Sequence, residues 1–412
     1  MTAQMILANG FGVAVASDSA STMTRRRSGA RTYETAEKIR PLSDPHRLAV
    51  LQCGGVHLLG MPVGVLIDEW KATLGSRLQT VEGYRDNFLT WLGDNLDNWS
   101  SPQSRDWAAF ESLEWIVEGL SDSIQTHLQE VHETDAHAAV LDELRNANQE
   151  LESLENHDPR LQDLADAVLG SWGEPGTDGG PSIASLIDHS LGDTPRSPEI
   201  DREIHRFIQL SVEGGYGFPS RARTTVTFVG YGQKEMFPSA ASVELFGAVG
   251  SHVARILLPP VYAEAHGSSC SLILPLAQRD VIDQLLTGLN TPMTAHAADV
   301  TVERLGATHV DPERPPEAQL DLIEDLGVVA SLRDEMLADQ IQVSRERYLE
   351  PTYAAVAGMP LGSLAEAAGA LIAMQNLALD IRGQLPTVGG NINVGTVTLS
   401  AGFDWVSHKG RS

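Results

Sequence analysis

The sequence predicts an α+β fold in which sheets pack against layers of helices. Strand-like segments gather in the first eighty residues and again after residue 222. A long helical and acidic stretch separates them, and further helices precede two closing strands. Helices and strands are thus segregated along the chain more than they alternate, and this order favours sheets covered by helix layers.

The chain opens with a predicted hairpin. Residues 2–7 form a short, largely apolar segment, and Asn9-Gly10 is a strong signal for a two-residue hairpin turn. Residues 12–17, GVAVAS, are apolar at nearly every position, which predicts a strand covered on both faces. With Asn9-Gly10 as the turn, Thr2 pairs with Ser17.

The next segments predict a loop, two strands and a helix. Residues 22–32 are polar and contain glycine, so we expect a loop there. Residues 37–42 and 47–53 predict strands, and Gly54-Gly55 ends the second of them. Residues 56–74 carry apolar side chains at helical spacing and predict a helix on the sheet.

Near residue 82 the sequence pattern changes from strands to acidic helices, and this change marks the start of a predicted insertion. Residues 82–212 contain several acidic amphipathic helical patterns, and strand patterns return at 224–232 and 242–250. We therefore expect one domain over residues 1–412 that is interrupted by a helical insertion at 82–212.

The last third of the chain predicts helices followed by two strands. A strand after Cys270 runs into a helix, and helices follow at 317–348 and 361–383. Residues 291–360 form an extra segment in this interpretation. The final strands surround a turn within residues 388–406.

The composition excludes several functions. A net charge of −26 would repel a phosphate backbone, so we expect no nucleic-acid partner, and Arg25-Arg26-Arg27 is interpreted as a solvated turn. Two cysteines indicate a reducing, cytoplasmic compartment. We find no run of about 18 apolar residues and no secretory leader, so no membrane association is expected.

The chemistry of the sequence concentrates at its start. Thr2 follows Met1, and a small second residue favours removal of the initiator methionine. Thr2 would then carry a free α-amine beside its hydroxyl, and such an amine can accept the hydroxyl proton. The pKa of a free α-amine is about 7.7–8.0, and a nearby ammonium lowers it.

Two charged residues are candidates to support this nucleophile. Asp18 lies one residue beyond the predicted partner of Thr2, within roughly 5–8 Å by sheet spacing. A carboxylate at the end of a buried strand needs a partner, and Lys38 opens the next strand. The alternatives are an Asp18 that caps a turn and a Lys38 at a solvated strand end.

The combination of Thr2, Asp18 in "GVAVASDS" and Lys38 resembles the proteasome β-subunit group of N-terminal-nucleophile (Ntn) hydrolases. Long bacterial proteasome-like proteins are the most similar group. The resemblance implies a four-layer αββα sandwich. It also implies that Thr2 is the nucleophile, that Lys38 tunes its amine and that Asp18 holds Lys38. The glycine of the family's oxyanion hole corresponds to about Gln52, whose backbone N–H could serve.

The resemblance covers roughly residues 1–80, 222–290 and 365–406, with departures near the end. The segment "LPTVGGNINVGTVTLS" resembles the family's terminal segment. Val388 stands where the family has a serine, and Leu385 where it has an aspartate that supports the amine. Thr387 is adjacent and could substitute.

The resemblance implies a hydrolase that cleaves amide bonds of peptides through an acyl-enzyme, without metal or organic cofactor. Its expected partners are a peptide or protein substrate and further copies of the chain, and any unfoldase is unknown. Two alternatives stay open. One is a catalytically inactive assembly or interaction subunit, and the other is a small-molecule amidase.

Other reactive residues give weaker signals. His127, His132 and His137 are five residues apart, so they do not share one helix face, whereas helical zinc ligands are spaced by three or four. We interpret this stretch as a solvated acidic helix, and Cys53 as a core residue.

Overall fold

The structure is a computed structural model. It describes residues 2–25, 29–33, 36–128, 136–153, 162–170, 182–191, 194, 196–214, 217–218, 223–263, 265–266, 269–290, 292–300, 335–382 and 389–408. The chain divides into two compact units. The first unit comprises Met1–Glu37, Met236–Ser239 and Tyr262–Ser412, and the second comprises Lys38–Glu235 and Ala240–Val261. Both combine helices with antiparallel sheets, which confirms the predicted α+β class.

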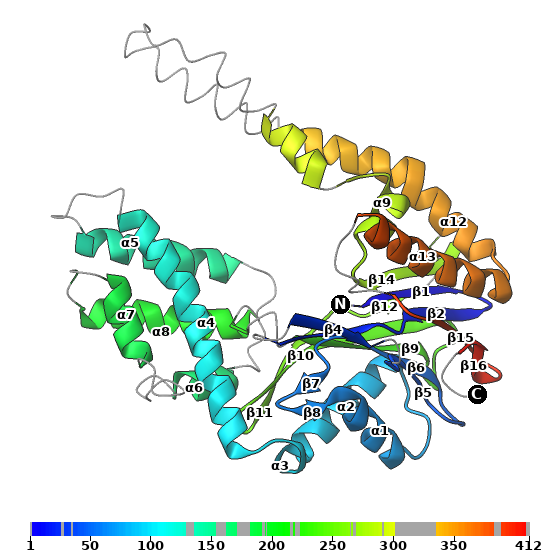
Figure 1. Cartoon of the computed structure of the whole chain (residues 1–412), viewed down its shortest axis with the longest axis horizontal. Helices are drawn as coiled ribbons and strands as arrows, with labels where there is room; N and C mark the ends of the chain where they lie inside the picture. The colour runs from blue at the N-terminus through cyan, green and yellow to red at the C-terminus, as the bar shows by residue number, and fades with distance from the viewer. Residues whose placement is uncertain are drawn as a thin grey trace, which may run out of the picture. The chain divides into compact units, whose positions relative to one another are not determined.

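The first unit is built on a six-stranded antiparallel sheet with the strand order β13-β14-β1-β2-β15-β16. Its strands are β1 (Ala3–Asn9), β2 (Gly12–Asp18), β13 (Ala265–His266), β14 (Ser269–Ala277), β15 (Ile392–Thr398) and β16 (Gly402–Ser407). Helices that follow β14 in sequence cover one face of this sheet (Figure 1). They are α9 (Asp280–Thr287), η5 (Arg345–Leu349), α12 (Glu350–Gly358) and α13 (Leu361–Ile381).

The opening hairpin exists, but its turn lies one residue later than predicted. Asn9 pairs with Gly12, so Gly10 and Phe11 form the turn, and Ser17 pairs with Gln4 instead of Thr2. The reason is the side chain of Asn9. Its Oδ1 accepts a hydrogen bond from the Phe11 N–H at 2.9 Å, while its Nδ2 donates to the carbonyl oxygens of residues 356 and 359 at 2.8 Å each.

Both faces of the opening strands are buried, as the apolar run predicted. Met5, Leu7 and Ala14 belong to the core that packs against the covering helices. Ile6 and Val15 alternate with them and are also fully buried. The sheet therefore has a second apolar face that is shielded from water.

Helix α13 is the core helix of this layer. Leu364, Ala368 and Ile372 pack into the sheet core, and the buried Gln375 accepts hydrogen bonds from backbone N–H groups at the start of α9. Among the described helices, α13 has the length and apolar composition of a possible membrane span. A buried face of this kind is the pattern of a core helix in a layered protein.

The second unit contains a five-stranded antiparallel path with the order β11-β10-β9-β6-β5, and the short β12 (Val261–Tyr262) pairs with β10. The strands of the path are β5 (Ile39–Pro41), β6 (Arg47–Gly54), β9 (Thr224–Tyr231), β10 (Ser239–Val249) and β11 (His252–Leu257). Helices α1 (Val63–Thr73) and α2 (Val81–Asp94) cover one face through Trp70, Tyr84 and Phe88 (Figure 1).

The helix predicted over residues 56–74 begins later than expected. A small hairpin, β7 (His57–Leu58) with β8 (Met61–Pro62), precedes it, and α1 starts at Val63. Leu59 and Gly60 adopt positive φ angles of 48° and 88°, which a helix cannot contain. The backbone of Pro62 is extended, with φ −61° and ψ 126°, and this residue immediately precedes the first turn of α1.

The acidic stretch forms a separate helical layer within the second unit. Its helices are α3 (Leu96–Trp99), α4 (Pro102–Leu128), α5 (Ala136–Ser153), α6 (Gln162–Leu169), α7 (Ile183–Leu191) and α8 (Pro198–Glu213). Leu113, Leu144 and Ile204 form their common core, to which Phe246 and Val249 of β10 also belong. Helix α2 lies inside the predicted insertion but packs on the sheet, so the core of the insertion begins at α4.

The segment predicted as a loop over residues 22–32 is instead a β-ribbon. Strands β3 (Ser21–Arg25) and β4 (Gly29–Tyr33) pair with each other as a two-stranded sheet. The threonines of TMTRRRSGART favour strands, which the sequence interpretation gave too little weight. Residues 26–28 lie outside the described residues.

Part of the extra segment also lies outside the described residues. Residues 292–300 and 335–344 are helical, whereas 301–334, where a helix was predicted from 317, cannot be compared. Residues 171–181, which include the whole of GEPGTDGGP at 173–181, a stretch whose glycines predict a flexible loop, also lie outside the described residues.

A buried histidine in the second unit gives this fold a pH dependence. His46 Nδ1 lies 2.7 Å from the hydroxyl oxygen of Tyr84, which also accepts a hydrogen bond from the Leu78 N–H at 3.2 Å. Burial first, and then the positive charge of Arg77, lower the pKa of His46 below its ordinary value of 6.5.

We expect His46 to destabilise the fold in acid. Because the unfolded chain binds this proton more readily, the free energy of unfolding falls as the pH drops below about 6.5, until the folded pKa is reached. Urea unfolding of the wild type and of His46→Asn between pH 8 and pH 5 measures this slope. The variant should have the lower stability at pH 8 and the flatter slope. His57→Asn, an exposed histidine, is the control, and equal slopes for His46→Asn and wild type would contradict the prediction.

Candidate active site

Thr2 lies immediately before β1 and is buried, with 6% of its surface exposed. Its carbonyl oxygen accepts a hydrogen bond from the Gln278 N–H, just beyond β14, at 2.9 Å. The next peptide N–H, that of Ala3, donates to Oδ1 of Asp18 at 3.0 Å. Both polar groups of the peptide unit between Thr2 and Ala3 are therefore hydrogen-bonded, and these bonds fix the backbone at Thr2.

Asp18 ends β2 and is fully buried. Its Oδ1 accepts the Ala3 N–H, and its Oδ2 accepts the N–H groups of Ala20 and Gly389, both at 3.2 Å. Hydrogen bonds to an ionised acceptor are stronger than neutral ones. Asp18 therefore ties the start of the chain to a segment more than 370 residues away, a role that the sequence did not indicate.

The segment that Asp18 holds is the start of the closing strands. Ala20 N–H donates to the Gly389 carbonyl at 3.1 Å, and Asn391 N–H donates to Ser19 Oγ at 2.9 Å. Gly390 has a φ of +72°, a conformation that favours glycine. Residues 385, 387 and 388, the departures from the family pattern, lie outside the described residues.

Lys38 belongs to the second unit and is buried, with 5% exposed. The sequence contains only four lysines among its 29 lysine and arginine residues, so few residues of this chain could place an ammonium group in a buried site. Lysine, unlike arginine, changes its pKa readily in a buried site. Burial raises the pKa of the neighbouring Cys53 to about 11, and the charge of Lys38 partly opposes this rise.

Gln52 lies beside Lys38, but its backbone N–H is already used. This N–H donates to the Lys38 carbonyl at 3.0 Å, in line with the pairing of β5 and β6. An N–H paired in a sheet is a poor oxyanion donor, which argues against the role predicted for Gln52.

Gly54, at the end of the same strand, has different surroundings. It is exposed, and its φ is +85°. A Cβ at this position would lie 2.5 Å from the Arg223 carbonyl oxygen, so the backbone there requires glycine. The Gly54-Gly55 pair was visible in the sequence as a strand end and as part of the family resemblance, but the oxyanion contact was expected near Gln52.

The predicted site residues therefore occur as two pairs. Thr2 and Asp18 lie together in the first unit, and Lys38 and Gln52 lie together in the second. The histidines of the acidic stretch form no cluster in the described residues: His137 Nε2 lies 3.2 Å from Ser197 Oγ, and His132 lies outside them.

No protein-family model matches the chain, and no curated protein matches it. The functional argument therefore rests on the residues and on their surroundings.

Proposed function

We propose that this protein is an N-terminal threonine hydrolase that cleaves amide bonds, with peptides as the substrate class. The observation that carries the proposal is the anchoring of Thr2. The Thr2 carbonyl continues the pairing of β1 with β14, as at any strand start, but the acceptor of the next N–H is a fully buried carboxylate, which is costly to bury and which a strand start does not require. A nucleophile does need such a fixed backbone, because its reactivity depends on position.

The proposed reaction begins when Thr2 becomes the amino-terminal residue, through removal of what precedes it. The Thr2 hydroxyl oxygen attacks the substrate carbonyl carbon, and the neutral Thr2 α-amine accepts the hydroxyl proton. Collapse of the tetrahedral intermediate breaks the C–N bond, and the α-ammonium returns the proton to the leaving amine. An ester to Thr2 remains. The α-amine then activates water, which hydrolyses the ester and restores the hydroxyl.

Lys38 and Asp18 support this chemistry in the proposal. The ammonium of Lys38 lowers the pKa of the α-amine and keeps more of it neutral at pH 7. The role of Lys38 is carried over from the family resemblance, and its burial and the scarcity of lysine in the sequence support it. Asp18 positions Thr2 through the Ala3 N–H.

We assign the oxyanion contact to the Gly54 backbone N–H in place of Gln52. Gly54 is exposed at the end of β6, whereas the Gln52 N–H is paired with Lys38. A backbone N–H held in place by the fold can stabilise developing negative charge without reorganising.

We further propose that the two units are halves of one four-layer αββα sandwich. Each sheet has one face covered by its own helices and a second face with fully buried apolar residues. Ile6 and Val15 represent the second face in the first unit, and Leu51 and Val229 represent it in the second. Stacking of these two faces would bury both, which is the usual way in which apolar sheet faces are satisfied.

Two alternatives predict different behaviour. An inactive assembly subunit is favoured by Leu385 and Val388, which replace polar groups of the family, and it would form no covalent adduct. A small-molecule amidase would form the adduct but would hydrolyse short amides in preference to peptides. Self-association and a cytoplasmic location are further expectations that the sequence supports.

Intact mass spectrometry tests the proposed nucleophile. We expect the purified protein to begin at Thr2, and we expect an epoxyketone, an electrophile directed at amino-terminal threonine, to add one molecule per chain. Peptide mapping should place the adduct on residue 2. A protein that retains Met1, or that begins at Thr2 and forms no adduct, would contradict catalysis and favour the assembly subunit.

A further inference from the structure

Helix α4 carries an exposed stripe of tryptophans and carboxylates, which we call the Trp–acid stripe. Trp107 is 48% exposed and Trp115 is 43% exposed, unusually high values for the largest apolar side chain. The residues of the stripe are Trp107, Glu111, Glu114, Trp115, Glu118 and Asp122. At 100° per residue they fall within about 100° of one another and extend over about 22 Å of helix.

The stripe lies on the side of α4 that faces away from the core. Leu113, Ile116 and Leu120 represent the opposite face, which packs against the other helices of the insertion. Exposed tryptophans on such a surface are typical of a binding site, because tryptophan is enriched among the residues that dominate protein interfaces. The surrounding carboxylates select a basic partner.

The chain itself contains a basic segment of matching size, the ribbon of β3 and β4. Residues 19–33 include four arginines and no acidic residue, in a chain with a net charge of −26. The register pairs Met23 with Arg31 and Ser21 with Tyr33. Met23, Arg25, Arg31 and Tyr33 occupy alternate register positions of the ribbon, and threonine and alanine occupy the positions between them.

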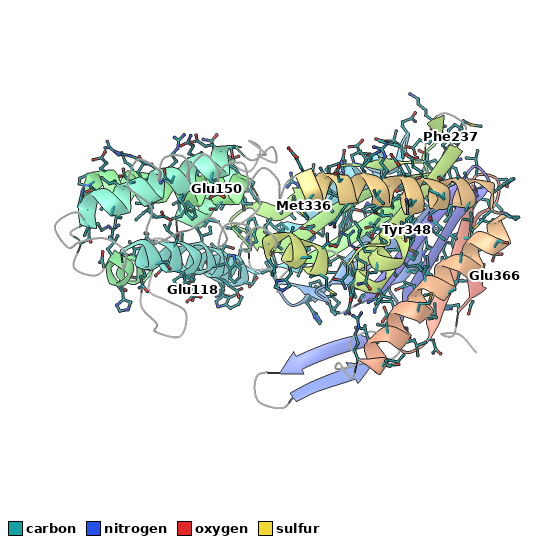
Figure 2. The ribbon with its side chains drawn as sticks, turned by 90° about the horizontal axis from the view of Figure 1, so that it is seen from above. Glu118, Glu150, Phe237, Met336, Tyr348 and Glu366 are labelled. Carbon is teal, nitrogen blue, oxygen red and sulfur yellow. The ribbon has the colours of Figure 1, made fainter. Side chains whose placement is uncertain are left out.

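This ribbon is also a structure that needs support. It is a two-stranded sheet of its own, and in Figure 2 its two strands project from the rest of the first unit. Two-stranded hairpins are marginally stable in water unless another surface packs on them. Five-residue strands measure about 16 Å, comparable with the stripe.

We propose that the β3–β4 ribbon of one copy of this chain docks on the Trp–acid stripe of a second copy. Arginine is the residue that combines ion pairing with stacking on tryptophan, so a ribbon with arginine, methionine and tyrosine complements a stripe of tryptophan and carboxylate. The contact joins two different surfaces, so it is heterologous and generates a ring or an open chain of copies.

Charge reversal on each side, followed by mixing, tests this contact. The arm variant is Arg25→Glu with Arg31→Glu, and the stripe variant is Glu118→Arg with Asp122→Arg. Sedimentation velocity over a range of concentrations should show association of the wild type and at least about tenfold weaker association of each variant alone. An equimolar mixture of the two should associate again, because each copy then offers a complementary partner to the other.

Mixing the two variants tests the contact, whereas the salt dependence of association does not. Added salt weakens the local ion pairs but also screens the repulsion between two chains of charge −26, so its net effect on association has no fixed sign. A contact within one chain would not be restored by mixing. Failure of the mixture to associate, or a wild type that stays monomeric at all concentrations, would overturn the proposal.

Two further variants complete the design. Glu150→Arg with Glu366→Arg makes the same change in net charge as the stripe variant but on two other helices, α5 and α13, and should associate like the wild type. Trp107→Ala with Trp115→Ala leaves every charge in place and should associate about tenfold more weakly. Loss of association in the first control, or none in the tryptophan variant, would contradict the stripe as the docking surface.

Discussion

Thr2→Ala is expected to abolish covalent labelling by an epoxyketone. The substitution removes the only hydroxyl of the residue and leaves its backbone contacts in place, so the anchoring by Gln278 and Asp18 should survive. Loss of a catalytic nucleophile lowers rates by at least about 10³-fold in hydrolases that form an acyl-enzyme. Amide hydrolysis, once a substrate is found, should fall by the same factor.

Thr2→Ser provides the matched control for this prediction. It keeps a hydroxyl on an amino-terminal residue, so it should still form the adduct, although more slowly. Both variants should melt close to the wild type, because the side chain loses at most a few atoms of burial. Undiminished labelling of Thr2→Ala would assign the reaction to another group and end the case for an N-terminal nucleophile.

Asp18→Ala is expected to destabilise the first unit as well as to eliminate activity. Two backbone N–H groups, those of Ala3 and Gly389, would lose their acceptor, whereas the Ala20 N–H keeps its bond to the Gly389 carbonyl. Each unsatisfied buried group costs about 1–3 kcal/mol, so we expect a loss of at least about 2 kcal/mol in the free energy of unfolding. Urea unfolding followed by circular dichroism measures it.

Asp18→Asn refines this test. Both carboxylate oxygens of Asp18 accept hydrogen bonds, so the asparagine amide must point its NH2 group towards at least one backbone N–H. We therefore expect Asp18→Asn to be less stable than the wild type but more stable than Asp18→Ala. Asp404→Asn, on the exposed strand β16, should leave stability unchanged within about 0.5 kcal/mol. Full stability in Asp18→Ala would show that these hydrogen bonds are replaced by water and that the carboxylate does not organise the site.

The sequence was sufficient to predict the elements that surround Thr2. The GVAVAS run predicted a strand buried on both faces, and β2 is one. The hairpin turn was misplaced by one residue because Asn9 makes its hydrogen bonds to the end of α12, nearly 350 residues away. Turn propensity reflects interactions among residues close in sequence, so it cannot predict the hydrogen bonds between Asn9 and the end of α12.

The partners of the site residues were less predictable. The pairing of Asp18 with Lys38 stays a prediction, but nothing in the sequence indicated that backbone N–H groups from three parts of the chain donate to the oxygens of Asp18. Gln52 was selected because it corresponds to the oxyanion-hole glycine of the resembled family, but its N–H is paired with Lys38, while Gly54 is exposed. Every residue except proline has a backbone N–H, so no sequence pattern shows which of them are paired.

By itself, the sequence determined where most strands and helices occur and which residues are candidates for the proposed chemistry, because hydrophobic periodicity and residue type are properties of composition and order. Only the tertiary structure decided that the carboxylate at the end of β2 joins the first residues to the segment at 389. Hydrogen bonds between distant segments depend on how the sheet brings them together, and that registry is set by packing over the whole chain.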